Sequence, residues 1–310
     1  MRAALLVPLL ASLALRVAAP WVSRRLPPPT AATLLAVTAL LTALSLGFTL
    51  SVAGLLTVAR IPIVAAAAQW SIGVVASGDP VPVGVGLLSG AVVIVLVYAA
   101  ARSALHHCRD LVAAATTCRR LHGSASGLVV REDDVADAYA LPGFTGRIVV
   151  STGMLRALPA PERKVLLAHE EAHLRHHHHL YVAAANLAAA ANPLLRPVSG
   201  AVAFSVERWA DEAAASEVDD RRLAARALAR AGLARLNSLT RARETGSALA
   251  AVDSSIGERT RALLAPPRPA SRRVVAVILL LAMASVGASA LVAHDTEHRF
   301  ELAHIRTSTE

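Results

Sequence analysis

Three long uncharged stretches set the strongest limit on how this chain can fold. Residues 31–59, 83–101 and 274–293 contain no Asp, Glu, Lys or Arg. Each is long enough to cross the hydrocarbon core of a bilayer as a helix. Residues 3–19 form a shorter apolar run, in which Arg16 can reach the membrane interface. A cleavable signal peptide is the alternative interpretation of this run. We expect four transmembrane helices.

The distribution of arginine predicts the orientation of these helices. The chain is 55% hydrophobic and has a formal net charge of +9, with Lys164 as its one lysine. If the N-terminus is outside, the inner side receives Arg24, Arg25, Arg102, Arg109, Arg119, Arg120, Arg268, Arg272 and Arg273, and the outer side receives Arg2, Arg60, Arg299 and Arg306. The positive-inside rule then places residues 102–273 in the cytoplasm.

The inner arginines also indicate which partners the chain has. Such clusters suit contact with the anionic headgroups of the bilayer. Direct binding of nucleic acid is not expected, because the sequence has no aromatic residues interleaved with the basic ones and no recognisable binding module. Cys108 and Cys118 lie on the predicted cytoplasmic side, where thiols stay reduced.

We therefore expect a mostly α membrane protein with an α+β domain inserted between its third and fourth spans. Residues 1–101 form the membrane domain with three helices. Residues 102–273 form the inserted cytoplasmic domain, and residues 274–293 form the fourth helix. Residues 294–310 are a short extracytoplasmic tail.

Two further apolar segments are ambiguous. Residues 61–78 are flanked by Pro62 and Pro80, which favours an outer-surface loop or re-entrant segment over a fifth span. A fifth span would put the inserted domain on the other side of the membrane. Residues 182–206 are long enough to cross, but Asn192-Pro193 and Gly200 interrupt them. We interpret them as buried domain helices and a turn pressed against the bilayer.

The inserted domain begins with a predicted helix over 103–123, followed by three short strands. The expected strands are 128–131, 138–141 and 147–151, separated by Pro142-Gly143 and Gly146. An edge strand beside a hydrolytic site can pair with an extended substrate. We predict this substrate-binding role for Ala138, Tyr139, Ala140 and Leu141; an ordinary sheet strand is the alternative.

The sequence His169-Glu170-Glu171-Ala172-His173 predicts a metal-dependent hydrolase. Pro159 and Pro161 precede it and favour a helix, on which His169 and His173 share one face. Two neutral imidazoles can hold one Zn²⁺ and leave a coordination position for water. Glu170 is then the catalytic base, which takes a proton from that water. The alternative is a helix that carries this spacing by chance.

Glu207 is the predicted third zinc ligand, because a second helix has room to return past the first after His173. Asp211 lies one helical turn beyond Glu207 and can accept a hydrogen bond from a liganding imidazole. Glu212 remains an alternative ligand. If residues 182–206 crossed the membrane, Glu207 would lie on the wrong side.

Three neighbouring segments have less specific patterns. The run from His176 to His179 continues the motif helix, and we expect a solvated helix end, although His176 or His177 could line the site. Arg221 and Arg222 fit a solvated helix face, with oxyanion stabilisation as the alternative. Residues 238–260 are rich in Ser, Thr, Arg and Gly and are expected to be mobile, exposed and suited to cleavage or regulation.

The order of three spans, a zinc domain and a fourth span resembles the antirepressor membrane metallopeptidases of the BlaR/MecR type. Residues 138–143, 148–153 and 168–170 are also similar to the HtpX-type and prenyl-protein proteases. The resemblance implies a gluzincin fold with one Zn²⁺ held by His169, His173 and Glu207, Glu170 as the catalytic residue and Asp211 behind a ligand. It also implies cleavage of a DNA-binding repressor in signal transduction, and self-cleavage.

Penicillin-sensing members carry a large extracellular domain, whereas residues 294–310 are too few to form one. We therefore expect a membrane-embedded zinc endopeptidase without that sensor. Two alternatives remain open at this stage. One is an HtpX-type quality-control protease, and the other is a non-catalytic signalling or scaffold protein with a structural zinc.

Overall fold

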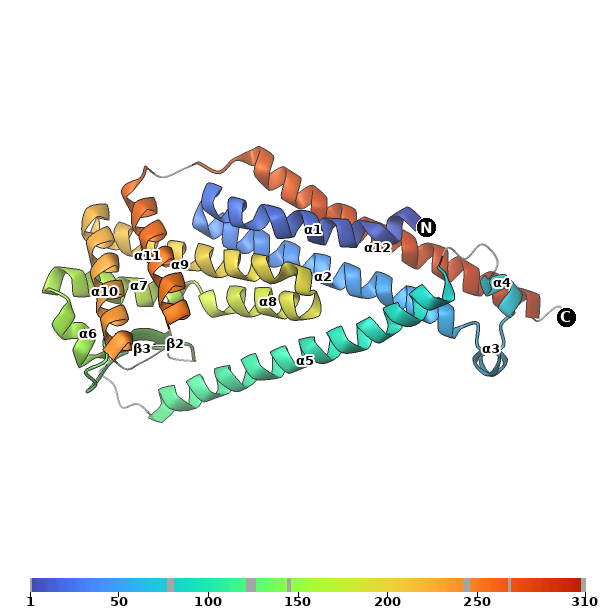
Figure 1. The fold of residues 1–310 in the computed structure, drawn as a ribbon, viewed down its shortest axis with the longest axis horizontal. Helices are drawn as coiled ribbons and strands as arrows, with labels where there is room; N and C mark the ends of the chain where they lie inside the picture. Colours follow the sequence, from blue (N-terminus) through green and yellow to red (C-terminus); the bar gives the residue numbers. More distant parts are fainter. Residues whose placement is uncertain are drawn as a thin grey trace.

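The computed structural model describes residues 2–76, 81–120, 127–143, 146–241, 246–266 and 269–307, without the side chains of 2–3, 239–254 and 306–307. It is an elongated molecule with a long helical bundle and a small sheet at one end (Figure 1). The two short helices α3 (Pro62–Ala68) and α4 (Ile72–Ala76) and the end of α12 (Arg272–Thr307) lie at the opposite end.

Four helices of the bundle are long and apolar enough to cross a membrane. They are α1 (Arg2–Arg25), α2 (Pro28–Val58), α5 (Val83–Arg120) and α12 (Arg272–Thr307). The prediction of four membrane helices is confirmed. The helix expected over 103–123 forms the last part of α5, which runs from its apolar part to Arg120 without a break. Likewise, α12 continues through most of the predicted tail. Residues 121–123 lie outside the described residues.

Residues 61–78 do not form a membrane-crossing helix in their described part. They contain α3 (Pro62–Ala68) and α4 (Ile72–Ala76), which have 7 and 5 residues and are too short to span. Trp70, between them, packs on Phe300 of α12 and donates from Nε1 to the Ala59 carbonyl at 2.9 Å. The loop after α2 is therefore fixed against the far end of α12. Residues 77–80 lie outside the described residues.

The three predicted strands are confirmed with their boundaries. The sheet has the order β1-β3-β2, with β1 (Leu128–Arg131) parallel and β2 (Ala138–Leu141) antiparallel to β3 (Arg147–Ser151). β2 is therefore an edge strand. The Ser151 side chain caps α6 (Thr152–Ala157), and α7 (Ala160–Arg175) follows it.

Residues 182–206 lie within a helical hairpin, which confirms the interpretation as buried helices with a turn. The hairpin consists of α8 (His178–Ala191), the short 3₁₀ helix η1 (Pro193–Leu195) and α9 (Arg196–Val218). It shares a hydrophobic core with α1 and α2. At its tip, Asn192 Nδ2 donates to Ser12 Oγ at 2.8 Å. Since Ser12 lies in the middle of the apolar part of α1, the hairpin reaches deep into the bundle.

Two helices complete the inserted domain. These are α10 (Arg221–Arg241) and α11 (Gly246–Leu264), which pack together and against α9. The prediction that 238–260 is mobile and exposed is wrong for residues 255–260, which are helical and half-buried or buried. Ile256 packs against Gly232 of α10, and this contact explains the order of the segment. Residues 242–245 and the side chains of 239–254 lie outside the described residues.

Candidate active site

Helix α7 carries the His169-to-His173 motif, and its start is well determined by the sequence. Pro159 is the N-cap residue with extended backbone, Pro161 occupies the first turn, and Glu162 lies where a carboxylate favours the helix dipole. Glu162 is buried and accepts from Arg230 Nη1 of α10 at 2.9 Å. This ion pair fixes the start of α7 against α10.

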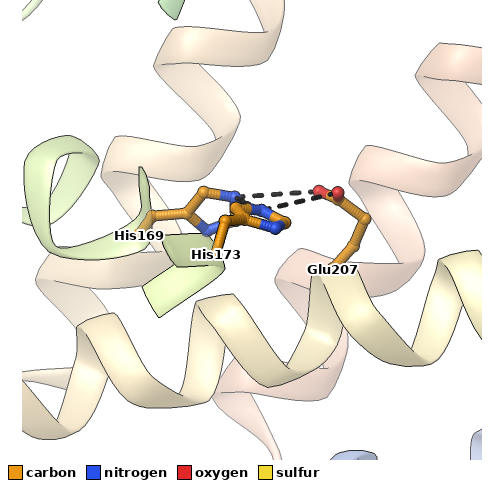
Figure 2. Close-up of side chains that lie close together, drawn as sticks. All are labelled: His169, His173 and Glu207. Atoms are coloured by element: carbon orange, nitrogen blue, oxygen red, sulfur yellow. Dashed lines mark hydrogen bonds and ion pairs between the residues drawn. The ribbon is translucent and has the colours of Figure 1, made fainter. Parts of the chain in front are cut away.

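The two motif histidines and Glu207 of α9 converge on one point (Figure 2). The Nε2 atoms of His169 and His173 lie 3.2 Å apart. Glu207 Oε2 lies 3.7 Å from His169 Nε2, and Glu207 Oε1 lies 3.6 Å from His173 Nε2. The structure thus brings together the three residues that the sequence analysis proposed as metal ligands.

The geometry of this cluster fits a zinc ion. Zinc binds His nitrogen and carboxylate oxygen at about 2.0–2.2 Å, and a tetrahedral arrangement then separates ligand atoms by about 3.3–3.6 Å. The three observed separations are close to that range. Two imidazole nitrogens and one carboxylate oxygen are also the donors of a catalytic zinc site with one coordination position left for water.

Asp211 lies behind the first of these histidines. Its Oδ1 is 3.1 Å from His169 Nδ1, and its side chain is buried. A hydrogen bond from Nδ1–H to this carboxylate leaves Nε2 free to face the cluster. Glu212 is instead held by Arg221, whose Nη2 donates to Glu212 Oε1 at 2.9 Å. The structure therefore places Glu207, and not Glu212, beside the histidines.

Glu170 is buried in the wall of the same cavity. Burial raises the pKa of its carboxyl group, and the Glu207 carboxylate acts in the same direction. His169 and a hydrogen bond with the backbone of Ala140 in β2 oppose this rise. The backbone of the edge strand is therefore directly beside the proposed catalytic base.

The two motif histidines differ in their electrostatic surroundings. Burial alone lowers the pKa of His169, but the hydrogen bond to Asp211 and the nearby Glu207 carboxylate raise it to about 10. Burial and the neighbouring His169 lower the pKa of His173 to about 4. The pKa of Glu207 is also lowered: burial alone raises it, but His169 and Arg259 outweigh this effect. The surroundings thus favour a proton on His169, between two carboxylates, and disfavour one on His173.

The cavity around the cluster has a volume of about 890 Å³. Ala138, Tyr139 and Ala140 of the predicted substrate-binding strand line it, whereas Leu141 does not. Helices α7, α8, α9, α10 and α11 contribute other walls, and the C-terminal half of α5 contributes one as well. The cavity is therefore bounded on one side by a continuation of a membrane helix.

Sequence reasoning missed two residues of this site. The motif helix ends at Arg175, and His177 adopts a left-handed conformation with φ of 51°, so the expected continuous helix through His179 is wrong. This break turns His178 inward, where it is fully buried and its Nδ1 lies 3.1 Å from His173 Nδ1. His176 instead stacks on Trp209.

Arg259 of α11 is the second residue that was missed. It is buried beside Asp211 and Glu207 and lines the cavity. Arg221, the arginine considered for the oxyanion, donates to Glu212 and to the Leu263 carbonyl and does not line the cavity. Nothing in the sequence distinguished Arg259 from the other arginines nearby in the chain, because its burial depends on a contact with α9.

Comparison with known families agrees with this geometry. A profile of peptidase family M48 matches residues 112–266, which include the motif helix, Glu207 and α11. The chain belongs to peptidase family M48. Neither the curated proteins nor the solved structures contain a match.

Membership of family M48 makes the chain a zinc metallopeptidase, and the cluster of His169, His173 and Glu207 is consistent with its zinc site. The four candidate spans make it a multi-pass membrane protein. The match begins in the C-terminal part of α5 and ends just after α11. The M48 region therefore begins in the last part of the third candidate span and ends before the fourth.

Proposed function

We propose that this M48 peptidase is an endopeptidase that cleaves a cytoplasmic protein, with a transcriptional repressor as the leading substrate. The observation that carries the proposal is the placement of the zinc cluster at the arginine-rich end of the bundle, between the third and fourth spans. The antirepressor membrane metallopeptidases share this order of segments. The arginine distribution supports a cytoplasmic position.

The residues of the site have separate tasks in the proposed reaction. When bound, zinc supplies a Lewis acid for the peptide carbonyl and lowers the pKa of water. Glu170 accepts a proton from the attacking water and delivers it to the leaving nitrogen. Its raised pKa suits both steps, because the carboxyl group holds the proton more readily than an exposed glutamate does. The edge strand β2 holds the substrate in extended form.

A substrate trap tests this proposal. Glu170→Gln should keep zinc and protein abundance but lower proteolysis by about 10²–10⁴-fold, the usual contribution of a general acid–base group. Glu171→Gln is the matched control, since Glu171 is exposed and forms an ion pair with Arg175 on the same helix, away from the zinc cluster. Full-length Glu170→Gln protein is crosslinked in cells, purified, and its bound proteins are identified.

Each outcome of the trap has a distinct meaning. Enrichment of one small DNA-binding protein supports the repressor as substrate. Enrichment of many damaged membrane proteins would instead make the chain a quality-control protease. Unchanged processing of every substrate in Glu170→Gln would leave a scaffold that retains zinc.

A further inference from the structure

One guanidinium group joins the two carboxylates that α9 contributes to the site. Arg259 Nε donates to Asp211 Oδ2 and Nη2 donates to Asp211 Oδ1, both at 2.7 Å. Its third nitrogen, Nη1, lies 2.9 Å from Glu207 Oε2. The side chain is only 10% exposed. Glu207 and Asp211 are one helical turn apart, so Arg259 spans that turn.

We propose that Arg259 is a positioning residue, which holds Glu207 and Asp211 in the geometry that zinc binding requires. Glu207 has a flexible side chain that is 39% exposed, and the described contacts that orient it are the two histidines and Arg259. Without the guanidinium, its carboxylate is free to turn toward solvent, and this freedom is lost when zinc binds.

Arg259 also affects the position of His169. Its Nδ1 faces Asp211, and Asp211 is itself fixed by two hydrogen bonds from Arg259. Arg259 thus acts on two of the three ligands at once: directly on Glu207, and on His169 through Asp211. Partners of this kind behind metal ligands typically change metal affinity by about 10–100-fold.

The position of Arg259 is in turn set by the packing of α11. Ile256, one turn earlier, is packed against α10 at Gly232. The neighbouring Glu258 pairs with Arg24 at the inner end of α1. Helix α11 is therefore held between α10 and a membrane helix, and it presents Arg259 to the site from a fixed direction.

Charge alone predicts the opposite effect on zinc affinity, and this contrast makes the proposal testable. A guanidinium beside the ligands repels a divalent cation, so removal of its charge should strengthen zinc binding. Positioning by the planar guanidinium group requires N–H groups on three nitrogens in fixed directions, which the single ammonium nitrogen of lysine does not provide. Lysine at this position therefore keeps the positive charge but cannot donate to both carboxylates with the geometry of a guanidinium group.

The experiment measures zinc affinity of the full-length protein in detergent by competition with a chromogenic chelator. Arg259→Lys and Arg259→Gln should both bind zinc about 10–100-fold more weakly than the wild type. Arg221→Lys is the matched control, because Arg221 makes a similar two-nitrogen contact with Glu212 on the same helix. It should stay within about threefold of the wild type. A shifted visible spectrum of the cobalt-loaded Arg259→Lys protein would report altered ligand geometry independently of activity.

Three results would overturn the proposal. Wild-type affinity in Arg259→Lys would show that the charge suffices. Tighter zinc binding in Arg259→Gln would show that repulsion dominates. Failure of both variants to fold would make Arg259 a structural residue only. The inference depends on the zinc site and not on the substrate, so a wild-type protein that binds one zinc but cleaves no repressor would leave it intact.

Discussion

His169 and His173 present the same imidazole to the zinc site but are held from behind by different groups. His169 Nδ1 faces the Asp211 carboxylate, whereas His173 Nδ1 faces the ring of His178. Burial and the adjacent His173 lower the pKa of His178 to about 3, so its ring stays neutral and can accept the Nδ1–H of His173. If zinc is held at His173 Nε2, the remaining proton of that ring lies on Nδ1, which faces His178 Nδ1.

We predict that His178→Ala lowers zinc affinity by about 10–100-fold, because His173 loses the acceptor that orients its ring. Chelator competition measures the affinity, and addition of excess zinc should restore peptidase activity. His177→Gly is the control: His177 is exposed, and glycine adopts its left-handed conformation without strain. Unchanged zinc affinity in His178→Ala would contradict the role assigned to this residue.

The residues that sequence alone could identify are those whose relation is local. Four-residue spacing on a helix predicts His169 with His173, and Glu207 with Asp211. The inward position of His178 was not predicted, because His177 adopts a left-handed conformation that ends one helix and begins another in a new direction. Arg259 was not predicted because it meets Asp211 only through tertiary packing, 48 residues along the chain. Its Ser- and Arg-rich surroundings indicated solvent exposure instead.

At the scale of elements, hydrophobic alternation and turn residues were sufficient for the sheet but not for helix continuity. All three strands begin and end at the predicted residues. By contrast, α5 continues past Arg102 into the inserted domain, because nothing between its apolar and polar parts breaks a helix. This continuity carries a membrane helix to the wall of the catalytic cavity.

The contact between α2 and α5 depends on glycine. A Cβ atom at Gly86 would lie 1.7 Å from Thr57 Oγ1 and 2.9 Å from the Ala53 carbonyl, so the two helices pack backbone to side chain at this point. Gly54 and Gly90 make a second close approach between the same helices. Small residues of this kind allow membrane helices to approach closely.

We predict that Gly86→Ala destabilises the protein by about 1–3 kcal/mol, the usual cost of overpacking. Gly84→Ala is the matched control on the same helix, because a Cβ atom there meets nothing within 4 Å. Thermal unfolding in detergent, followed by circular dichroism, measures both. Equal midpoints for the two variants would show that the α2–α5 contact tolerates an added methyl group.

At the scale of the whole molecule, the zinc site and the end of α12 lie at opposite ends of the bundle (Figure 1). The hairpin of α8 and α9 enters the bundle from the catalytic end and returns to it, so Glu207 stays on the side of His169. The sequence predicted this return from the requirement that the ligands meet. It did not predict the depth of the hairpin, because the Asn192–Ser12 contact joins segments 180 residues apart.

This separation of the two ends makes the proposed orientation directly measurable. Cys108 is exposed on α5 beyond the uncharged part of that helix, and Cys118 is buried. A cysteine introduced by Glu301→Cys into a Cys108→Ser background lies at the other end, on an exposed position of α12. In right-side-out membrane vesicles, we predict that a membrane-impermeant maleimide labels the residue-301 cysteine of this variant. The same reagent should leave Cys108 of the wild-type protein unlabelled.

Permeabilisation of the vesicles should then expose Cys108 to the reagent, while Cys118 reacts only after denaturation. The physical reason is the positive-inside rule: moving the inner arginines to the outside would place most of the juxtamembrane positive charge on the wrong face. Labelling of Cys108 in intact vesicles, with protection of the residue-301 cysteine, would put the zinc site outside the cell. A cytoplasmic repressor would then be out of its reach, so this measurement decides which compartment supplies the substrate.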